Sequence, residues 1–266
     1  MRTRPPLHLT QSPLVFVLAQ ARFSPIAKME AFAPQIQETL RRKGFPGYQV
    51  RTTQELTFGP VPQASQSQRW FFSSKEGTSA VILSTDFVVL ATSTYEHFED
   101  LVANFEIALA AVQEASEPSF ATRVGLRYVD LIRPAERESL DEYLQPGLHG
   151  VRPEEIEASA VSRQFHLTAK TRAGTISVRL WQNTEGKILP PDLVGDEVEF
   201  RVPPAAPGEL LTVLDLDHYS RKQQEFAPAL LIADLWALHD GTDLAFRRIV
   251  TEQAIARWGG TPAPTN

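Results

Sequence analysis

The sequence predicts an α+β protein, in which an antiparallel sheet carries helices on one face and two halves share one order of elements. Apolar and polar side chains alternate along residues 122–132, a pattern typical of a β-strand. Residues 97–115 repeat apolar side chains at helical spacing, which indicates a helix packed on a sheet. Short turns join the β-branched runs between residues 69 and 94, and connections of this length make antiparallel neighbours.

The first half, residues 13–117, is predicted to run from a strand and a helix through an antiparallel meander to a second helix. Its expected elements are a strand at 14–23, a helix at 26–43 that contains Pro34, a strand at 48–58, a polar loop at 63–68, strands at 69–73, 79–84 and 87–94, and the helix at 97–115. Each strand is rich in β-branched or aromatic residues, and Gly or Pro marks several of the breaks.

The second half, residues 118–258, repeats this order in pattern but not in residue identity. Its expected elements are the strand at 122–132, a short helix at 140–144, strands at 160–171 and 175–183, a proline-rich link at 185–208 with a brief strand at 198–202, a strand at 210–219, and helices at 226–239 and 243–258 separated at Gly241. Residues 1–12 and 259–266 are rich in Pro, Gly and Thr and are expected to be flexible ends. Whether the strands form one sheet or two is left open.

Composition narrows the class of protein. Of the 266 residues, 42% are hydrophobic and 22% are charged, close to the averages of globular proteins, so neither disorder nor membrane residence is expected. The absence of cysteine excludes disulfides, thiolate metal sites and a cysteine nucleophile. The apolar run at 14–19 is too short for a signal peptide or a membrane span, so we expect a cytoplasmic protein. A net charge of -6 disfavours nucleic acid as a partner.

Arginines on alternate strand positions form the first candidate site. Arg123 and Arg127 share one face of the central strand, with Gly125 leaving open space between them. A guanidinium group binds carboxylates and phosphates through two parallel hydrogen bonds, and an indole ring can stack on a planar ligand. The predicted ligand-binding residues, which Arg22 is expected to join, are Arg123, Arg127, Arg179 and Trp181. The alternative is a structural network in which these arginines pair with aspartates on neighbouring strands.

Asp215 and Asp217 form the second candidate site. They lie two residues apart on one strand and therefore share a face, so they are candidate ligands for Mg²⁺ or Mn²⁺. Such a site needs a further oxygen ligand, for which the sequence offers Asp130, Glu199 or Asp234 without singling one out. The alternative is a solvated sheet face on which both carboxylates pair with arginines.

Motifs for other chemistries are absent from the sequence. The six histidines are scattered, with no pair four residues apart and no acidic cluster at metal-ligand spacing. Neither a Gly-x-Ser-x-Gly motif nor a glycine-rich phosphate loop occurs. The sequence therefore predicts no catalytic residues and no cofactor.

Three stretches carry a resemblance to a known family. They are residues 13–25, which contain the Arg22-Phe23 pair, residues 123–130, with the order Arg-Val-Gly-Leu-Arg-Tyr-Val-Asp, and residues 214–217 together with the closing segment 246–259, which ends in Trp258-Gly259. The chain is similar along nearly its whole length to a sporadically distributed bacterial family of uncharacterised proteins. Asp130 stands where that family usually has Asn. The resemblance implies a bacterial origin and an accessory role.

We expect a non-enzymatic binding module that uses the open sheet face to capture an anionic small molecule or a protein partner. The alternative is a metal-dependent phosphoester hydrolase that works through Asp215 and Asp217. An exposed sheet face of mixed character is also compatible with a two-fold homodimer.

Overall fold

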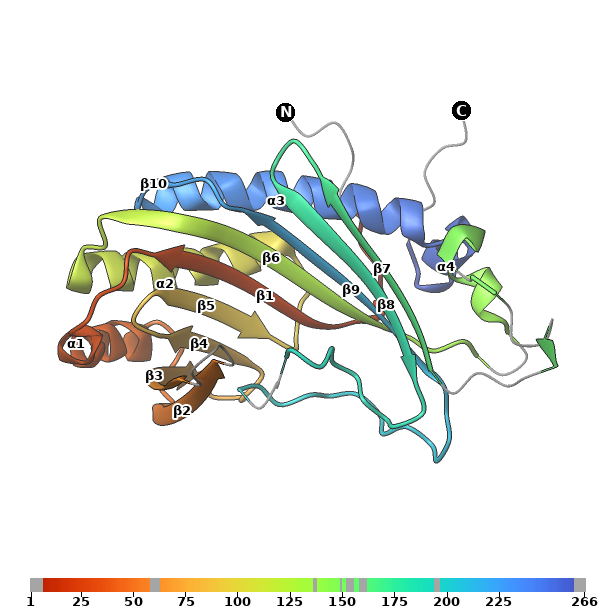
Figure 1. The fold of residues 1–266 in the computed structure, drawn as a ribbon, viewed down its shortest axis with the longest axis horizontal. Helices are drawn as coiled ribbons and strands as arrows, with labels where there is room; N and C mark the ends of the chain where they lie inside the picture. Colours follow the sequence, from red (N-terminus) through yellow and green to blue (C-terminus); the bar gives the residue numbers. More distant parts are fainter. Residues whose placement is uncertain are drawn as a thin grey trace.

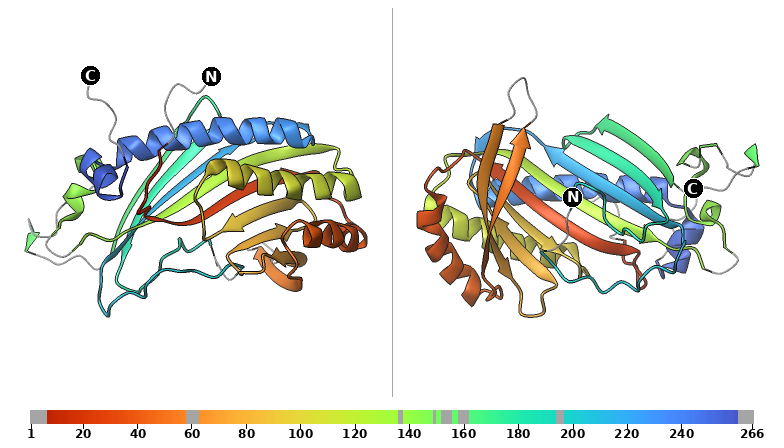
Figure 2. Two further views of the ribbon diagram at one scale, coloured as in Figure 1. Left: turned by 180° about the vertical axis from the view of Figure 1, so that it is seen from behind. Right: turned by 60° about the horizontal axis from the view of Figure 1, so that its bottom comes forward.

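Helices cover one face of a single antiparallel sheet. The computed structural model describes residues 7–57, 63–135, 138–148, 150–151, 156–157, 162–193 and 197–260, and the sheet it describes has ten strands. Figure 1 views this sheet from its open side. The left view of Figure 2 shows α2 (Phe98–Ser116) and α3 (Pro228–Ile249) lying across the opposite face. The predicted α+β class, with helices on one face of an antiparallel sheet, is confirmed.

Besides α2 and α3, the described chain contains further strands, two α-helices and two 3₁₀ turns. They are β1 (Leu14–Phe23), α1 (Met29–Arg42), β2 (Gln49–Thr57), β3 (Gln63–Ser73), β4 (Ser79–Leu83), β5 (Phe87–Thr92), β6 (Phe120–Ile132), 3₁₀ turns at Leu140–Glu142 and Pro146–Leu148, β7 (Ser162–Lys170), β8 (Thr175–Asn183), β9 (Leu211–Ser220), β10 (Gln224–Glu225) and α4 (Glu252–Arg257).

The two halves meet where β1 pairs with β6 at the centre of the sheet. The strand order is β2-β3-β4-β5-β1-β6-β9-β8-β7, and β10 pairs with the start of β6. In each half the first strand is central, the last long strand lies beside it, and the earlier strands continue outward to the edge. The described strands therefore form one sheet with a repeated topology. Within the described ranges, the second half has short 3₁₀ turns where the first half has α1.

Alternation along β6 divides its side chains between two environments, as predicted. Val124, Leu126 and Tyr128 are at most 8% exposed and belong to the apolar cluster that includes Phe105 of α2 and Leu235 of α3. Arg123 and Arg127 occupy the alternate positions and face the open side. Because burying one large apolar side chain stabilises a fold by about 1.5–3 kcal/mol, this cluster fixes which face of β6 is covered.

α3 continues through Gly241, so the predicted break between two helices at this residue is wrong. A Cβ atom at position 241 would lie 2.6 Å from Cε1 of His218, a buried residue of β9. Nδ1 of the same ring is 2.9 Å from the carbonyl oxygen of Leu238 in α3. The glycine therefore allows the helix to approach the sheet closely, and it does not end the helix.

Two other predictions about local structure are also wrong. Residues 63–68, predicted as a polar loop, form the first part of β3 and pair with β2. Backbone groups make this ladder, so polar side chains do not prevent it. Residues 198–202, predicted as a brief strand, are irregular, and Val198 packs against the open sheet face. Pro203 and Pro204 follow and cannot donate to a β-ladder.

The ends of the described chain lie against each other. The backbone N–H of Gln11 donates to the carbonyl oxygen of Trp258 at 3.0 Å, and Leu7 and Leu9 pack on the cluster that contains Trp258. Residues 7–12 are thus held in place, although their composition alone predicts a flexible end. The predictions for residues 1–6 and 261–266 lie outside the described residues.

Replacing Gly241 by alanine tests the close approach of α3. Helix propensity alone predicts that Gly→Ala stabilises the protein by up to about 1 kcal/mol. The clash with the buried His218 ring predicts the opposite sign, a loss of about 1–3 kcal/mol. Urea unfolding should therefore show G241A to be less stable than the wild type. The exposed Ala237→Gly in the same helix provides the propensity control, and a more stable G241A would contradict the packing explanation.

Candidate functional site, an arginine-lined groove

The open face of the sheet brings the predicted arginines and aspartates together. Arg127 lies on β6, Arg179 on β8, and both Asp215 and Asp217 on β9 between them. Strand alternation places all four on the face away from the helices. The ion-pair network predicted across neighbouring strands is therefore present in the structure.

Asp215 is the centre of this network and is only 1% exposed. Arg127 donates to its two oxygens, from Nε at 2.7 Å and from Nη2 at 3.0 Å. Arg179 adds a third bond, from Nε at 2.6 Å. Two guanidinium groups thus compensate one buried carboxylate, which makes the strand pairs β6–β9 and β8–β9 mutually dependent.

Asp192 approaches the same arginines from the link between β8 and β9. Arg127 donates to its two oxygens, from Nη1 at 2.8 Å and from Nη2 at 3.0 Å. Burial opposes ionisation of Asp192, but the hydrogen bonds and charges of Arg127 and Arg179 lower its pKa to about 2. Burial would likewise lower the pKa of Arg127, but its hydrogen bonds to Asp192 and Asp215 raise the pKa above the ordinary value. Both groups therefore stay charged at neutral pH.

Arg123 and Asp217 form a looser pair beside this network. Their closest atoms, Nη2 and Oδ1, are 3.3 Å apart. Burial lowers the pKa of Arg123 and raises that of Asp217, in each case against the effect of the opposite charge. A Cβ atom at Gly125 would lie 2.7 Å from Nη1 of Arg123. The space over Gly125, predicted to be open, thus accommodates the Arg123 guanidinium group.

A groove of about 1080 Å³ opens over this network, and we refer to it as the arginine groove. Seven arginines and three acidic residues line it. They are Arg22, Arg51, Arg69, Arg123, Arg127, Arg179, Arg221, Asp192, Glu197 and Asp217. The described lining is therefore basic, although the whole chain is acidic.

Sequence reasoning missed Arg51, Arg69, Arg221 and Asp192. Arg51 and Arg69 are opposite each other in the β2–β3 ladder, which places two like charges on one face of the sheet. Only the pairing of these strands reveals it. Arg221 lies just beyond β9, with its guanidinium carbon 5.1 Å from the centre of the Tyr219 ring.

Trp181 has a different setting from the arginines. It lies on the open face but is partly buried in the apolar cluster of Val129 and Val213, which the link residues Ile188 and Phe200 cover. It is not among the residues that line the arginine groove. The predicted stacking role of Trp181 therefore has no support from the groove geometry.

The three proposed additional metal ligands lie apart from the two aspartates. Asp130 is on the helix side of β6, Asp234 accepts a bond from Gln224, and Glu199 lies near Gly77. In the part of the chain that the structure describes, no group of three or more His, Asp or Glu side chains could hold a metal ion. The metal site at Asp215 and Asp217 stays a prediction.

Substituting Asp215 and Asp192, the two partners of Arg127, should show how differently a buried and an exposed ion pair contribute to the free energy of unfolding. D215N leaves Arg127 buried without its main counter-charge, so we expect a loss of about 3 kcal/mol in the free energy of unfolding. The side chain of Asp192 is 51% exposed, and D192N should cost less than about 1 kcal/mol.

The pH dependence of D192N follows from the sign of the pKa shift. Because the folded-state pKa of Asp192 is lowered from 3.8 to about 2, its contribution is fully present above pH 3.8 and is lost as the pH falls through about 2. Urea unfolding of the wild type and D192N should therefore converge at the acidic end. A difference that grows toward low pH would contradict this assignment.

Titration with Mg²⁺ and Mn²⁺ tests the metal-site hypothesis directly. Because arginines already compensate Asp215, we expect neither heat in calorimetry nor a shift of the melting temperature. Saturable heat that disappears in D217N would instead support a metal site at these aspartates.

No protein-family model, curated protein or solved structure matches this chain. The resemblance to the bacterial family of uncharacterised proteins therefore stays a prediction. Among the described residues, no helix is both long enough and apolar enough to cross a membrane.

Proposed function

We propose that the protein is a non-enzymatic binding module that captures an anionic ligand in the arginine groove. The observation that carries this proposal is the excess of arginines in one groove of an acidic protein. Guanidinium groups that converge on one space favour ligands with carboxylate or phosphate groups.

The hydrogen bonds of Asp192 support a ligand with a carboxylate or phosphate group. Its carboxylate accepts two bonds from the end of the Arg127 guanidinium group, at 2.8 and 3.0 Å. A side chain of the protein thus occupies the position that a ligand carboxylate or phosphate would take. Because Asp192 is half exposed and comes from a link, an anionic ligand can compete with it at low cost.

Arginines at the rim add further positive charge to the groove, and one of them, Arg22, also donates to Asp86 at 2.7 Å. Arg22 and Arg221 are exposed, and Arg51 and Arg69 face each other across the β2–β3 ladder. The guanidinium carbons of Arg22 and Arg69 lie 5.3 and 5.6 Å from the centre of the Phe87 ring. This arrangement favours a ligand that combines negative charge with a flat or apolar part.

The bacterial cytoplasm is part of this proposal as the setting of the protein. A protein partner would use the same groove through its own acidic side chains. Nucleic acid is a weaker candidate because the net charge of the chain is -6.

Charge reversal at the rim tests the proposal, with inorganic pyrophosphate and citrate as calorimetric probes at low salt. R22E and R221E should each weaken binding about tenfold or more, because each removes a charged partner of the anion. D192N should strengthen binding, since it removes the competing carboxylate. Arg127 is less suitable for charge reversal, because it is buried against Asp215.

The exposed Arg248→Glu in α3 is the matched control for net charge, because it lies outside the groove. Binding that weakens equally in R248E would show a general effect of charge and would count against the groove. The same would follow if neither probe bound the wild-type protein. A single-stranded oligonucleotide should bind more weakly than either probe under these conditions.

A further inference from the structure

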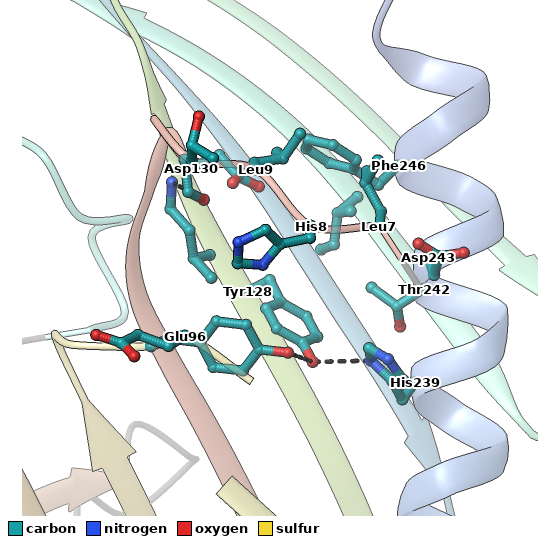
Figure 3. Close-up of a pocket in the computed structure, with 15 residues that line it drawn as sticks. Leu7, His8, Leu9, Glu96, Tyr128, Asp130, His239, Thr242, Asp243 and Phe246 are labelled. Carbon is teal, nitrogen blue, oxygen red and sulfur yellow. Dashed lines mark hydrogen bonds between the residues drawn. The ribbon is translucent and has the colours of Figure 1, made fainter. Parts of the chain in front are cut away.

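A second cavity of about 490 Å³ lies on the helix side of β6 (Figure 3). Residues 7–12 border it on one side, α3 on another, and the segment that leads into α2 contributes Tyr95 and Glu96. The central sheet therefore separates this cavity from the arginine groove. Its volume is within the range typical of small-molecule sites.

The charged side chains that line this cavity are opposite in sign to those of the arginine groove. Its described lining contains the carboxylates of Glu96, Asp130 and Asp243 but neither arginine nor lysine. Asp243 is paired with Arg247, whose Nε is 2.9 Å from Oδ2. Leucines and Phe246 supply the apolar part of the wall. A cavity with this lining favours a ligand that combines positive charge with an apolar body.

Asp130 is the feature that indicates a missing partner. It is 3% exposed and lines the cavity. No hydrogen bond or ion pair joins its carboxylate to another residue that the structure describes. Buried carboxylates are normally paired, because an uncompensated one is costly. Burial, and to a smaller extent the charge of Asp215, raises the pKa of Asp130 to about 8.

Aromatic groups converge on the same space (Figure 3). The hydroxyl of Tyr128 and Nδ1 of His239 share a hydrogen bond of 2.9 Å, and the Tyr95 hydroxyl is 3.5 Å from that of Tyr128. Phe98 stacks on the His239 ring at a centroid distance of 3.8 Å. Burial raises the pKa of Tyr128 well above its ordinary value, so the phenol stays neutral. Neutral aromatic rings beside a carboxylate are suited to an organic cation.

We propose that this cavity is a binding site for a small organic amine, with Asp130 as the counter-ion of the ammonium group and the aromatic and leucine side chains around its apolar body. The site is spatially separate from the arginine groove, because it lies on the other face of the sheet, and it selects the opposite charge.

The proposed binding has a defined proton linkage. Without ligand, Asp130 keeps its proton until the pH approaches about 8, so ammonium binding below that pH releases a proton. Amine affinity should rise as the pH approaches 8 and then level off. The other titratable groups facing the cavity are Glu96, Asp243, His8, His239, Tyr95 and Tyr128. The Asp130 variant separates the contribution of Asp130 from that of these other groups.

Calorimetry and thermal shift with tyramine, phenethylamine and agmatine test the site at about pH 9, which is above the raised pKa of Asp130 and at which these amines remain largely protonated. At least one amine should bind and raise the melting temperature. For tyramine and phenethylamine, the matching alcohols, which keep the ring and lose the charge, should bind at least about tenfold more weakly. If none of the three amines binds the wild-type protein, the proposal is wrong.

D130N provides the decisive variant, with E114Q on the exposed face of α2 as the control for loss of one carboxylate. D130N should lose amine affinity about tenfold or more while melting no lower than the wild type, because it removes an unpaired buried acid. E114Q and the groove variant R221E should bind amines like the wild type. Unchanged amine affinity in D130N would overturn the assignment.

Proton release gives a second test that needs no variant. Calorimetry of the wild type near neutral pH in buffers of different ionisation enthalpy should show release of close to one proton per bound amine. Amine binding without proton release would exclude Asp130 as the counter-ion.

Discussion

The register between β1 and β6 is the constraint on which the rest of the structure depends. Val17 pairs with Tyr128, and Ala19 pairs with Leu126, at the centre of the sheet. Side chains on a strand alternate between faces, so a slip of one residue would move Arg127 into the apolar layer and Leu126 into the groove. The apolar cluster under α2 and α3 prevents this slip, because its buried area is lost if the faces exchange. The same packing that stabilises the fold thereby positions the functional side chains.

β6 consequently separates two spaces with opposite electrostatic character. Its odd-numbered positions direct Arg123 and Arg127 toward the arginine groove, and its even-numbered positions direct Tyr128 and Asp130 toward the cavity beside α3. The two sides are not electrically independent, because the charge of Asp215 contributes to the raised pKa of Asp130. A ligand that changes the charge balance on one face of a sheet this thin can therefore influence ionisation on the other face.

The two buried aspartates of the central strands, Asp215 and Asp130, differ in whether a positive charge compensates them. Asp215 is 1% exposed and receives hydrogen bonds from two arginines, so its burial is compensated within the described chain. Asp130 is almost as deeply buried and has no such partner among the described residues. Burial therefore raises the pKa of Asp130 to about 8, and the group avoids the cost of an unpaired buried charge by keeping its proton below that pH. Side chains with strongly shifted pKa values concentrate at functional sites, where a ligand can provide the missing partner.

The sequence by itself determined the elements with strong periodicity and the shared face of Arg123 and Arg127. The alternation at 122–132 and the helical spacing at 97–115 predicted β6 and α2, and the spacing of Asp215 and Asp217 predicted their shared face. Only the tertiary structure decided the pairing of Arg51 with Arg69, the approach of Asp192, and the helix that continues through Gly241. These features depend on contacts between segments far apart in the chain, which local periodicity does not encode. Asp130 is the clearest example, since its strand position was readable from sequence whereas its burial beside α3 arises from packing alone.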